Sequence, residues 1–290
     1  MTPADSISAG NALLLLAALA GIGIAWLRPL PAGAVGRGGE SLWPPWNFRL
    51  TRILFLVWAV VLVLVAANAA GLTLLRAGTV EGAPPSEPLL RWTGVLSTVV
   101  LQLGLLGVGL WAVRARGWTL PGFFRESGDS DRSAFRVSLQ RFLRLLPLVW
   151  LVGVLWGLLL VLLRALGLPL EPEPQRAVLW IAESDSPAFL LSMGVLVVIG
   201  APVVEELIFR GLLFRYLSEK LSLSLALWTS GVLFALLHAS LQSFLPLVVL
   251  GVLLAKVYRE SGDLRVPILF HLFFNLFSFL NLLLLPAPPG

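Results

Sequence analysis

Repeated apolar stretches, each about as long as a helix needs to cross a bilayer, constrain this chain more than any other feature. We predict eight of them, over residues 11–27, 53–75, 92–113, 145–168, 188–207, 221–239, 244–258 and 266–285. Apolar residues make up 58% of the chain and charged residues 13%, which is outside the usual range of soluble domains. No two-residue alternation typical of membrane β-barrels recurs, so helices must satisfy the backbone. The sequence therefore predicts an all-α, polytopic membrane protein, a bundle of about eight transmembrane helices.

The basic residues concentrate in alternate loops. If the N-terminus is outside, 17 of the 21 Lys and Arg residues, Arg210 among them, fall in loops predicted to be cytoplasmic. The positive-inside rule then places both termini outside. The net charge of +5 thus reflects topology. We expect contact with membrane lipid, no nucleic-acid partner, and a multi-pass protein of the plasma (inner) membrane.

We divide the chain at residue 145. Residues 1–145 hold N-terminal transmembrane helices, the first of them retained, and a basic cytoplasmic loop. In that loop Phe135, Leu139, Phe142 and Leu146 form one helical stripe between arginines, which predicts an amphipathic helix on the cytoplasmic surface, against anionic lipid. Residues 146–290 form the second region. It contains small residues four apart, Gly231 with Ala235 and Gly251 with Ala255, which would let helices approach closely.

Polar side chains inside the membrane indicate where function lies, because each ionisable group there costs about 2.5–3.5 kcal/mol on insertion scales. Long cations near span ends can reach water, and we assign Arg164 and Lys256 to this class. Single amides most simply bond neighbouring helices, and we assign Asn68, Gln102 and Asn281 to this class. The remaining groups lie in the last hundred residues, with both histidines of the chain. The absence of cysteine excludes a thiolate metal site and a Cys nucleophile.

The stretch VVEELIFRG places two carboxylates at the end of an apolar run. Glu206 and Arg210 are four residues apart and share a helix face, whereas Glu205 is turned by about 100° and points elsewhere. Pro202 just upstream predicts a kink. The alternative is that the stretch is an amphipathic cytoplasmic extension of the span, with its charges in water.

Two further groups lie on later helices. His238 shares a face with Phe234, and His271 shares a face with Asn275. Each group alone could be a packing or hydrogen-bonding feature. Together, one carboxylate, two imidazoles and an amide are what activation of water and stabilisation of an oxyanion require.

The depth of His238 limits this hypothesis. If its span began at the membrane surface near Leu221, His238 would lie about 25 Å away, on the wrong side of the bundle. The hypothesis therefore requires a break within the bundle at residues 239–243. A separation of more than about 10 Å from both Glu205 and His271 would exclude a catalytic cluster.

The segments EELIFR, FALLH and HLFFN resemble the three motifs of the CAAX-processing and bacteriocin-protection family of intramembrane proteases. The resemblance covers residues 188–282 and nothing before residue 146. It implies that Glu205 and His238 activate a water, that His271 and Asn275 hold the oxyanion, and that Glu206 and Arg210 support them. The family is often described as metallopeptidases, so Glu205, His238 and His271 could bind zinc. We expect no cofactor and keep zinc as the alternative.

The leading hypothesis is an intramembrane endopeptidase that hydrolyses a peptide bond of a membrane-associated protein or peptide, with its active site toward the cytoplasmic side. Two alternatives remain. One is a non-proteolytic membrane immunity or scaffold protein of the same fold. The other is a proton- or cation-coupled transporter that uses the buried carboxylates.

Overall fold

The computed structural model describes residues 19–26, 50–79, 84–117, 119–124 and 131–284, and these residues form helices and no strand. The predicted all-α membrane fold is confirmed. Five helices are long and apolar enough to cross a membrane: Phe55–Gly78, Glu87–Ala115, Ala134–Ala165, Pro187–Lys220 and Arg265–Leu284. Of the predicted first span, residues 19–26 are helical and the rest lies outside the described residues.

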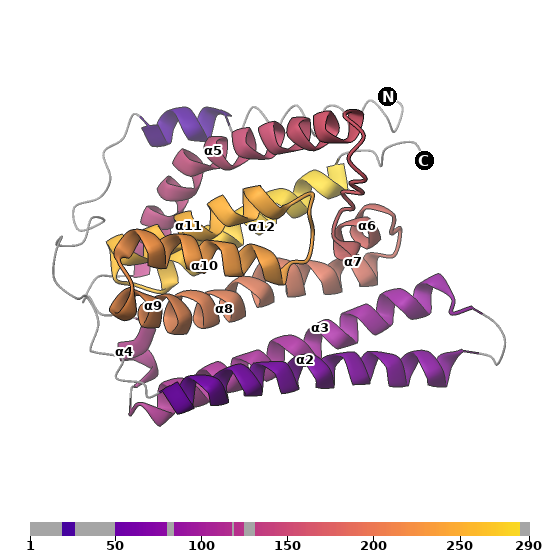
Figure 1. Ribbon diagram of the computed structural model, residues 1–290, viewed down its shortest axis with the longest axis horizontal. Coiled ribbons are helices and arrows are strands. Elements are labelled where there is room, and N and C mark those ends of the chain that lie inside the picture. Colours follow the sequence, from indigo (N-terminus) through magenta and orange to yellow (C-terminus); the bar gives the residue numbers. More distant parts are fainter. Residues whose placement is uncertain (1–18, 27–49, 80–83, 118, 125–130, 285–290) are drawn as a thin grey trace.

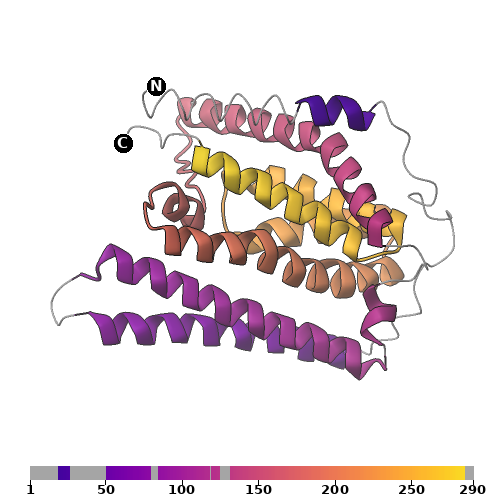
Figure 2. The same cartoon turned by 180° about the vertical axis from the view of Figure 1, so that it is seen from behind.

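The helices form three layers (Figures 1 and 2). A hairpin of α2 (Leu50–Gly78) and α3 (Glu87–Ala115) covers one side, and α5 (Asp131–Ala165) covers the other. The middle layer holds the helix Pro187–Lys220, with α10 (Leu223–Leu237), α11 (Phe244–Ser261) and α12 (Arg265–Leu284). We call one end of the bundle the α4 end, after α4 (Leu120–Phe124), and the other the α6 end, after α6 (Arg176–Ala182).

The predicted sixth and seventh spans form a short hairpin. α10 has 15 residues and α11 has 18, whereas α5 has 35. These lengths correspond to about 22, 27 and 52 Å, so the hairpin tip at residues 238–243 ends inside the bundle. This is the break that the sequence required. Ser240 at the tip is buried and donates a hydrogen bond to the carbonyl of Glu173 at 3.2 Å, which ties the tip to the segment before α6.

Glycines bring the two helices of this hairpin together. A Cβ on Gly251 would lie 2.8 Å from the Cα of Gly231, and a Cβ on Gly231 would lie 2.7 Å from the carbonyl oxygen of Val248. The close approach predicted from the small-residue pattern is confirmed for α10 and α11. It fixes the backbone of α11 against the base of the site described below.

The prediction of a separate surface helix before residue 145 is wrong. α5 runs without interruption from residue 131 to residue 165, across Pro147 and across our division of the chain. The later part of its stripe faces protein, since Phe142 and Leu146 are buried and the Phe142 ring lies 6.1 Å from that of Phe270, whereas Phe135 is 49% exposed. The stripe fits the aromatic face of α12 as well as it would fit lipid, and the sequence of α5 alone cannot distinguish the two.

The helix Pro187–Lys220 changes its hydrogen-bonding register at the predicted kink. It comprises α7 (Pro187–Gly194), the π-helical segment η1 (Val195–Gly200), α8 (Ala201–Glu206), the π-helical segment η2 (Leu207–Phe214) and α9 (Arg215–Lys220). In a π register the carbonyl of Val197 would accept from residue 202, which is proline and has no N–H. Asn275 of α12 donates to that carbonyl instead, at 2.8 Å.

The three amides assigned to contacts between helices behave differently. Gln102 of α3 donates to the carbonyl of Leu196 in η1 at 3.0 Å, as predicted. Asn68 and Asn281 each donate to the carbonyl four residues earlier in their own helix, Leu64 and Phe277. For these two the prediction was wrong, because an amide on a helix can bond its own backbone at no cost in helix packing.

Candidate active site

The carboxylate of Glu205 faces both histidines. Its Oε2 atom lies 3.9 Å from Nε2 of His238 and 3.9 Å from Nε2 of His271. Both distances are far below the separation of about 10 Å that would have excluded a catalytic cluster. The short α10–α11 hairpin therefore places His238 at the depth of Glu205 and His271. Side chains separated by 33 residues at each step thus meet at one oxygen atom.

The orientation of the His238 ring is fixed by its own helix. Its Nδ1 atom lies 2.8 Å from the carbonyl oxygen of Phe234, one turn earlier, and the two rings lie 4.8 Å apart. A carbonyl oxygen can only accept, so Nδ1 carries the proton. In the neutral ring Nε2 then offers a lone pair toward Glu205.

Glu206 connects two other groups of the site. Its Oε1 atom accepts a hydrogen bond from Nη1 of Arg210 at 2.9 Å and lies 2.9 Å from Nδ1 of His271. The exposed fractions of the three side chains are 0, 0 and 3%. The predicted Glu206–Arg210 pair is confirmed, but the bond to His271 was missed. These two residues are 65 positions apart, and no local spacing reports such a contact.

Arg210 links Glu206 to the backbone of α11. Its Nη2 atom donates to the carbonyl of Gly251 on α11 at 2.8 Å, and its guanidinium lies 4.7 Å from the centre of the Phe234 ring. The alternative of a solvated helix extension is therefore wrong, as is the assignment of Arg210 to a cytoplasmic loop. One carboxylate, one carbonyl and one aromatic face surround the buried guanidinium, and their interactions offset the free-energy cost of removing its charge from water.

Asn275 lies one turn beyond His271 on α12. One N–H of its amide is used in the bond to Val197, which leaves a second N–H on the same nitrogen. The side chain lines the same cavity as Glu205, His238 and His271. Its first bond holds α12 against η1, so the amide is positioned by the proline-induced gap in the backbone hydrogen bonds.

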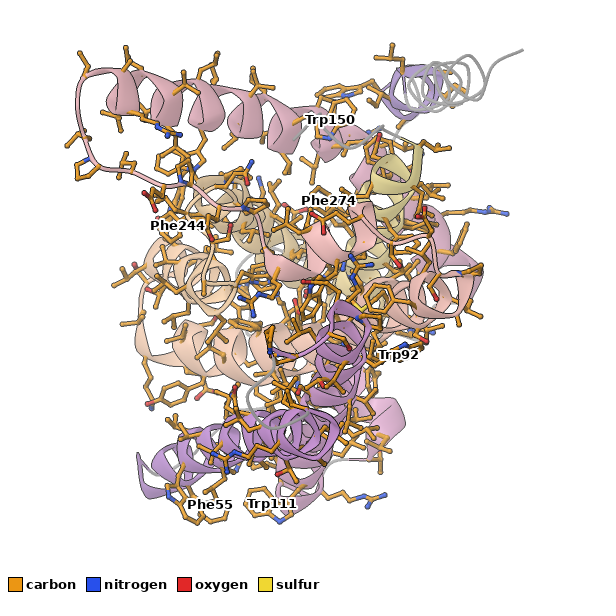
Figure 3. The ribbon with its side chains drawn as sticks, turned by 90° about the vertical axis from the view of Figure 1, so that its right-hand side faces the viewer. Phe55, Trp92, Trp111, Trp150, Phe244 and Phe274 are labelled. Carbon is orange, nitrogen blue, oxygen red and sulfur yellow. The ribbon has the colours of Figure 1, made fainter. Side chains whose placement is uncertain are left out.

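These four side chains line a cavity of about 650 Å³. Most of its wall is apolar and comes from α3, α5, α6, α11 and α12. Phe274, one of the lining residues, lies in the middle of the bundle, whereas Phe55 and Trp111 lie on its outer edge (Figure 3). Glu206 and Arg210 are buried behind the wall, which gives the two adjacent carboxylates different surroundings.

The three side chains kept as a possible zinc site lie farther apart here than the ligands of a bound zinc ion would. Bonds of about 2.0–2.1 Å in tetrahedral geometry place ligand atoms about 3.3 Å apart, and both nitrogens are 3.9 Å from the Glu205 oxygen. Within the described part of the chain, no group of three His, Cys, Asp or Glu side chains is placed to hold a metal ion.

Comparison with known proteins points to the same region. Residues 187–277 match the family model described as Type II CAAX prenyl endopeptidase Rce1-like. A protein of Bacillus subtilis (strain 168) named "Putative membrane peptidase YdiL" is 32% identical over 111 residues, which are 38% of this chain and 43% of that protein. No solved structure matches the chain. The resemblance to CAAX-processing proteases is confirmed over the matched region.

Proposed function

With this family match as the premise, we propose that the protein is an intramembrane endopeptidase, similar to CAAX proteases, that hydrolyses a peptide bond of a membrane-associated protein or peptide. One observation carries the proposal. Two imidazole nitrogens lie 3.9 Å from one carboxylate oxygen, at the wall of a mostly apolar cavity. A carboxylate and an imidazole that share a small gap in this way are suited to activate water.

The nucleophile is a water molecule between Glu205 and His238. Their facing atoms are too far apart to bond directly, and a water about 2.8 Å from each spans the gap. Both atoms are acceptors, so the water donates both hydrogens and turns a lone pair toward the substrate carbonyl. As its oxygen attacks the carbonyl carbon, one O–H bond breaks, the proton moves to Glu205, and the carbonyl electron pair becomes an oxyanion.

The oxyanion is held by His271 and Asn275. Two carboxylates and one guanidinium leave the cluster with one negative charge, so one further proton makes it neutral, as a buried site requires. We place this proton on Nε2 of His271, whose Nδ1–H is held by Glu206. The second N–H of Asn275 is the other donor. Glu205 then gives its proton to the leaving nitrogen, the C–N bond breaks, and a carboxyl group is released.

Glu206 and Arg210 act as positioning residues. Glu206 orients the His271 ring, in the way that a carboxylate orients a catalytic histidine elsewhere. Arg210 neutralises Glu206 and ties it to α11. Neither side chain reaches the cavity, so neither touches the substrate in this scheme.

The proposal is tested by comparing membrane proteins from cells that produce the wild type, Glu205→Gln, His238→Ala or Asn275→Ala, by mass spectrometry of newly formed protein termini. We expect the wild type to generate termini that are absent with the first two variants and reduced with the third. Asn68→Ala and Asn281→Ala are matched controls, because each amide bonds only its own helix. Identical termini in every strain would contradict the protease. Ion flux in proteoliposomes that depends on Glu205 would favour the transporter.

A further inference from the structure

The cavity extends in one direction from the catalytic groups. Along α12 its lining residues run from His271 to Leu282, which is about 16 Å toward the α6 end. Along the helix Pro187–Lys220 they run from Val197 to Glu205, and no described residue beyond Glu205 lines it. The catalytic groups therefore form its floor.

The opposite direction is closed by packed side chains. A buried cluster that includes Phe209, Phe234, Leu254 and Phe270 fills the bundle between the floor and the α4 end. The ion pair of Glu206 and Arg210 lies within this packing and is fully buried. A polypeptide could reach Glu205 from the α4 end only if this core opened.

Charge identifies which side of the membrane the α6 end faces. Of the basic residues in the described part, only Arg76, Arg91, Arg164 and Arg176 lie at the α6 end, and most of the others lie in the helix ends and connections toward the α4 end. The positive-inside rule makes the α4 end cytoplasmic. The floor of the cavity is nearer that end, since His271 is about 9 Å from Arg265 along α12, but the cavity leads away from it.

The short hairpin provides the entrance. α10 ends at Leu237 and α11 begins at Phe244, so their tip stops short of the α6 end. The segment that leads into α6 borders the space above the tip and is attached to it through the bond between Ser240 and Glu173. Gln242 at the tip is exposed and lines the cavity. Pro174 and Gln175, which are half-buried, line it as well. Polar loop backbone at this depth is tolerated where it borders a water-filled space.

We propose that substrates reach Glu205 from the non-cytoplasmic side of the membrane, between the α10–α11 tip and α6. The path of about 16 Å corresponds to about five residues of extended chain. The substrate is thus a protein with an unwound, mostly apolar segment beside its membrane anchor on that side. This inference rests on the proposed function and replaces the cytoplasmic access that we expected from the sequence.

The chain has no cysteine, so single cysteines can report accessibility without further changes. Ser278→Cys places a thiol in the cavity wall and Gln242→Cys places one at the entrance. Leu166→Cys and Leu223→Cys mark the α6 and α4 ends, where the native side chains are 72% and 47% exposed. Ala226→Cys, at a fully buried position, gives the background. The probe is a membrane-impermeant methanethiosulfonate, applied to intact cells and to inside-out vesicles of the full-length protein.

We expect the cysteines at 166, 242 and 278 to react at least tenfold faster from the non-cytoplasmic side, and the cysteine at 223 from the cytoplasmic side. Reaction at 278 from the cytoplasmic side, or from neither side, would overturn the proposal, as would a reversed pattern at the two end markers. Modification at 278 should also abolish cleavage by that variant relative to its unmodified form. The labelling needs no activity, so a variant that is labelled as expected while the wild type cleaves nothing would refute the protease and leave the opening of the cavity established.

Discussion

The buried contact between Glu206 and Arg210 gives the sharpest test of how this site is built. Glu206→Leu replaces the carboxylate by an apolar side chain of similar volume. It removes the partner of both Arg210 and Nδ1 of His271. Arg210 would keep its bond to Gly251 and its contact with Phe234, but its charge would be uncompensated at 0% exposure.

The expected loss of stability follows from that burial. Removing one partner of a buried ion pair costs about 3–5 kcal/mol, whereas replacing both partners by apolar side chains is often neutral. At about 2–4 °C for each kcal/mol, Glu206→Leu should lower the thermal midpoint by about 6–20 °C. The double variant Glu206→Leu, Arg210→Met should recover most of this loss.

Activity should respond differently from stability. In the double variant Nδ1 of His271 still lacks its partner, so the ring that faces Glu205 is free to turn. A displacement of about 1 Å in a catalytic group can cost about a hundredfold in rate. We therefore expect a stable protein whose cleavage is reduced by about that factor.

Both quantities are measurable on protein purified in detergent: the midpoint from the fraction that stays monodisperse after heating, and cleavage from the newly formed termini in reconstituted membranes. Asn68→Ala serves as the control for each. A single variant as stable as the wild type would refute the energetic argument. A double variant that regains full cleavage would show that Glu206 serves only to neutralise Arg210, and would refute its role in orienting His271.

Two further predictions concern packing and metal. Gly251→Ala should destabilise the protein by about 1–3 kcal/mol and lower cleavage, because the new Cβ would lie 2.8 Å from Gly231 and displace the carbonyl that holds Arg210; Gly107→Ala, which meets no atom within 4 Å, should be neutral or stabilising, and equal effects of the two would contradict this reading. Cleavage should survive exhaustive chelation with no zinc found by elemental analysis of the purified protein, whereas stoichiometric zinc and loss of activity on its removal would restore the metal-dependent alternative.

Local sequence determined much of the site. The spacing of Glu206 and Arg210 predicted their pair, and the position of Pro202 predicted a disturbance of the helix that the structure shows as a π-helical segment. The motifs at Glu205, His238 and His271 predicted groups that do meet. The first two depend on neighbours within one or two turns of a helix, and helical geometry is fixed by the chain itself. The meeting of Glu205, His238 and His271 joins separate helices, and only the resemblance to the family motifs implied it.

Other features were decided only by contacts between distant segments. Hydropathy gives the length of an apolar run but not the depth at which its helix begins, so the sequence could not show that α10 and α11 form a short hairpin whose tip reaches Glu205. The sequence could not show whether the apolar stripe of α5 faces lipid or α12, because both surroundings are apolar. The contact between Glu206 and His271 joins two helices that are distant in the sequence. The cavity leads toward α6 because side chains from separate helices fill the α4 end of the bundle and leave the other end open. Hydropathy and helical spacing thus determined which chemical groups this protein carries in the membrane, and tertiary packing decided which of them meet and from which side they can be reached.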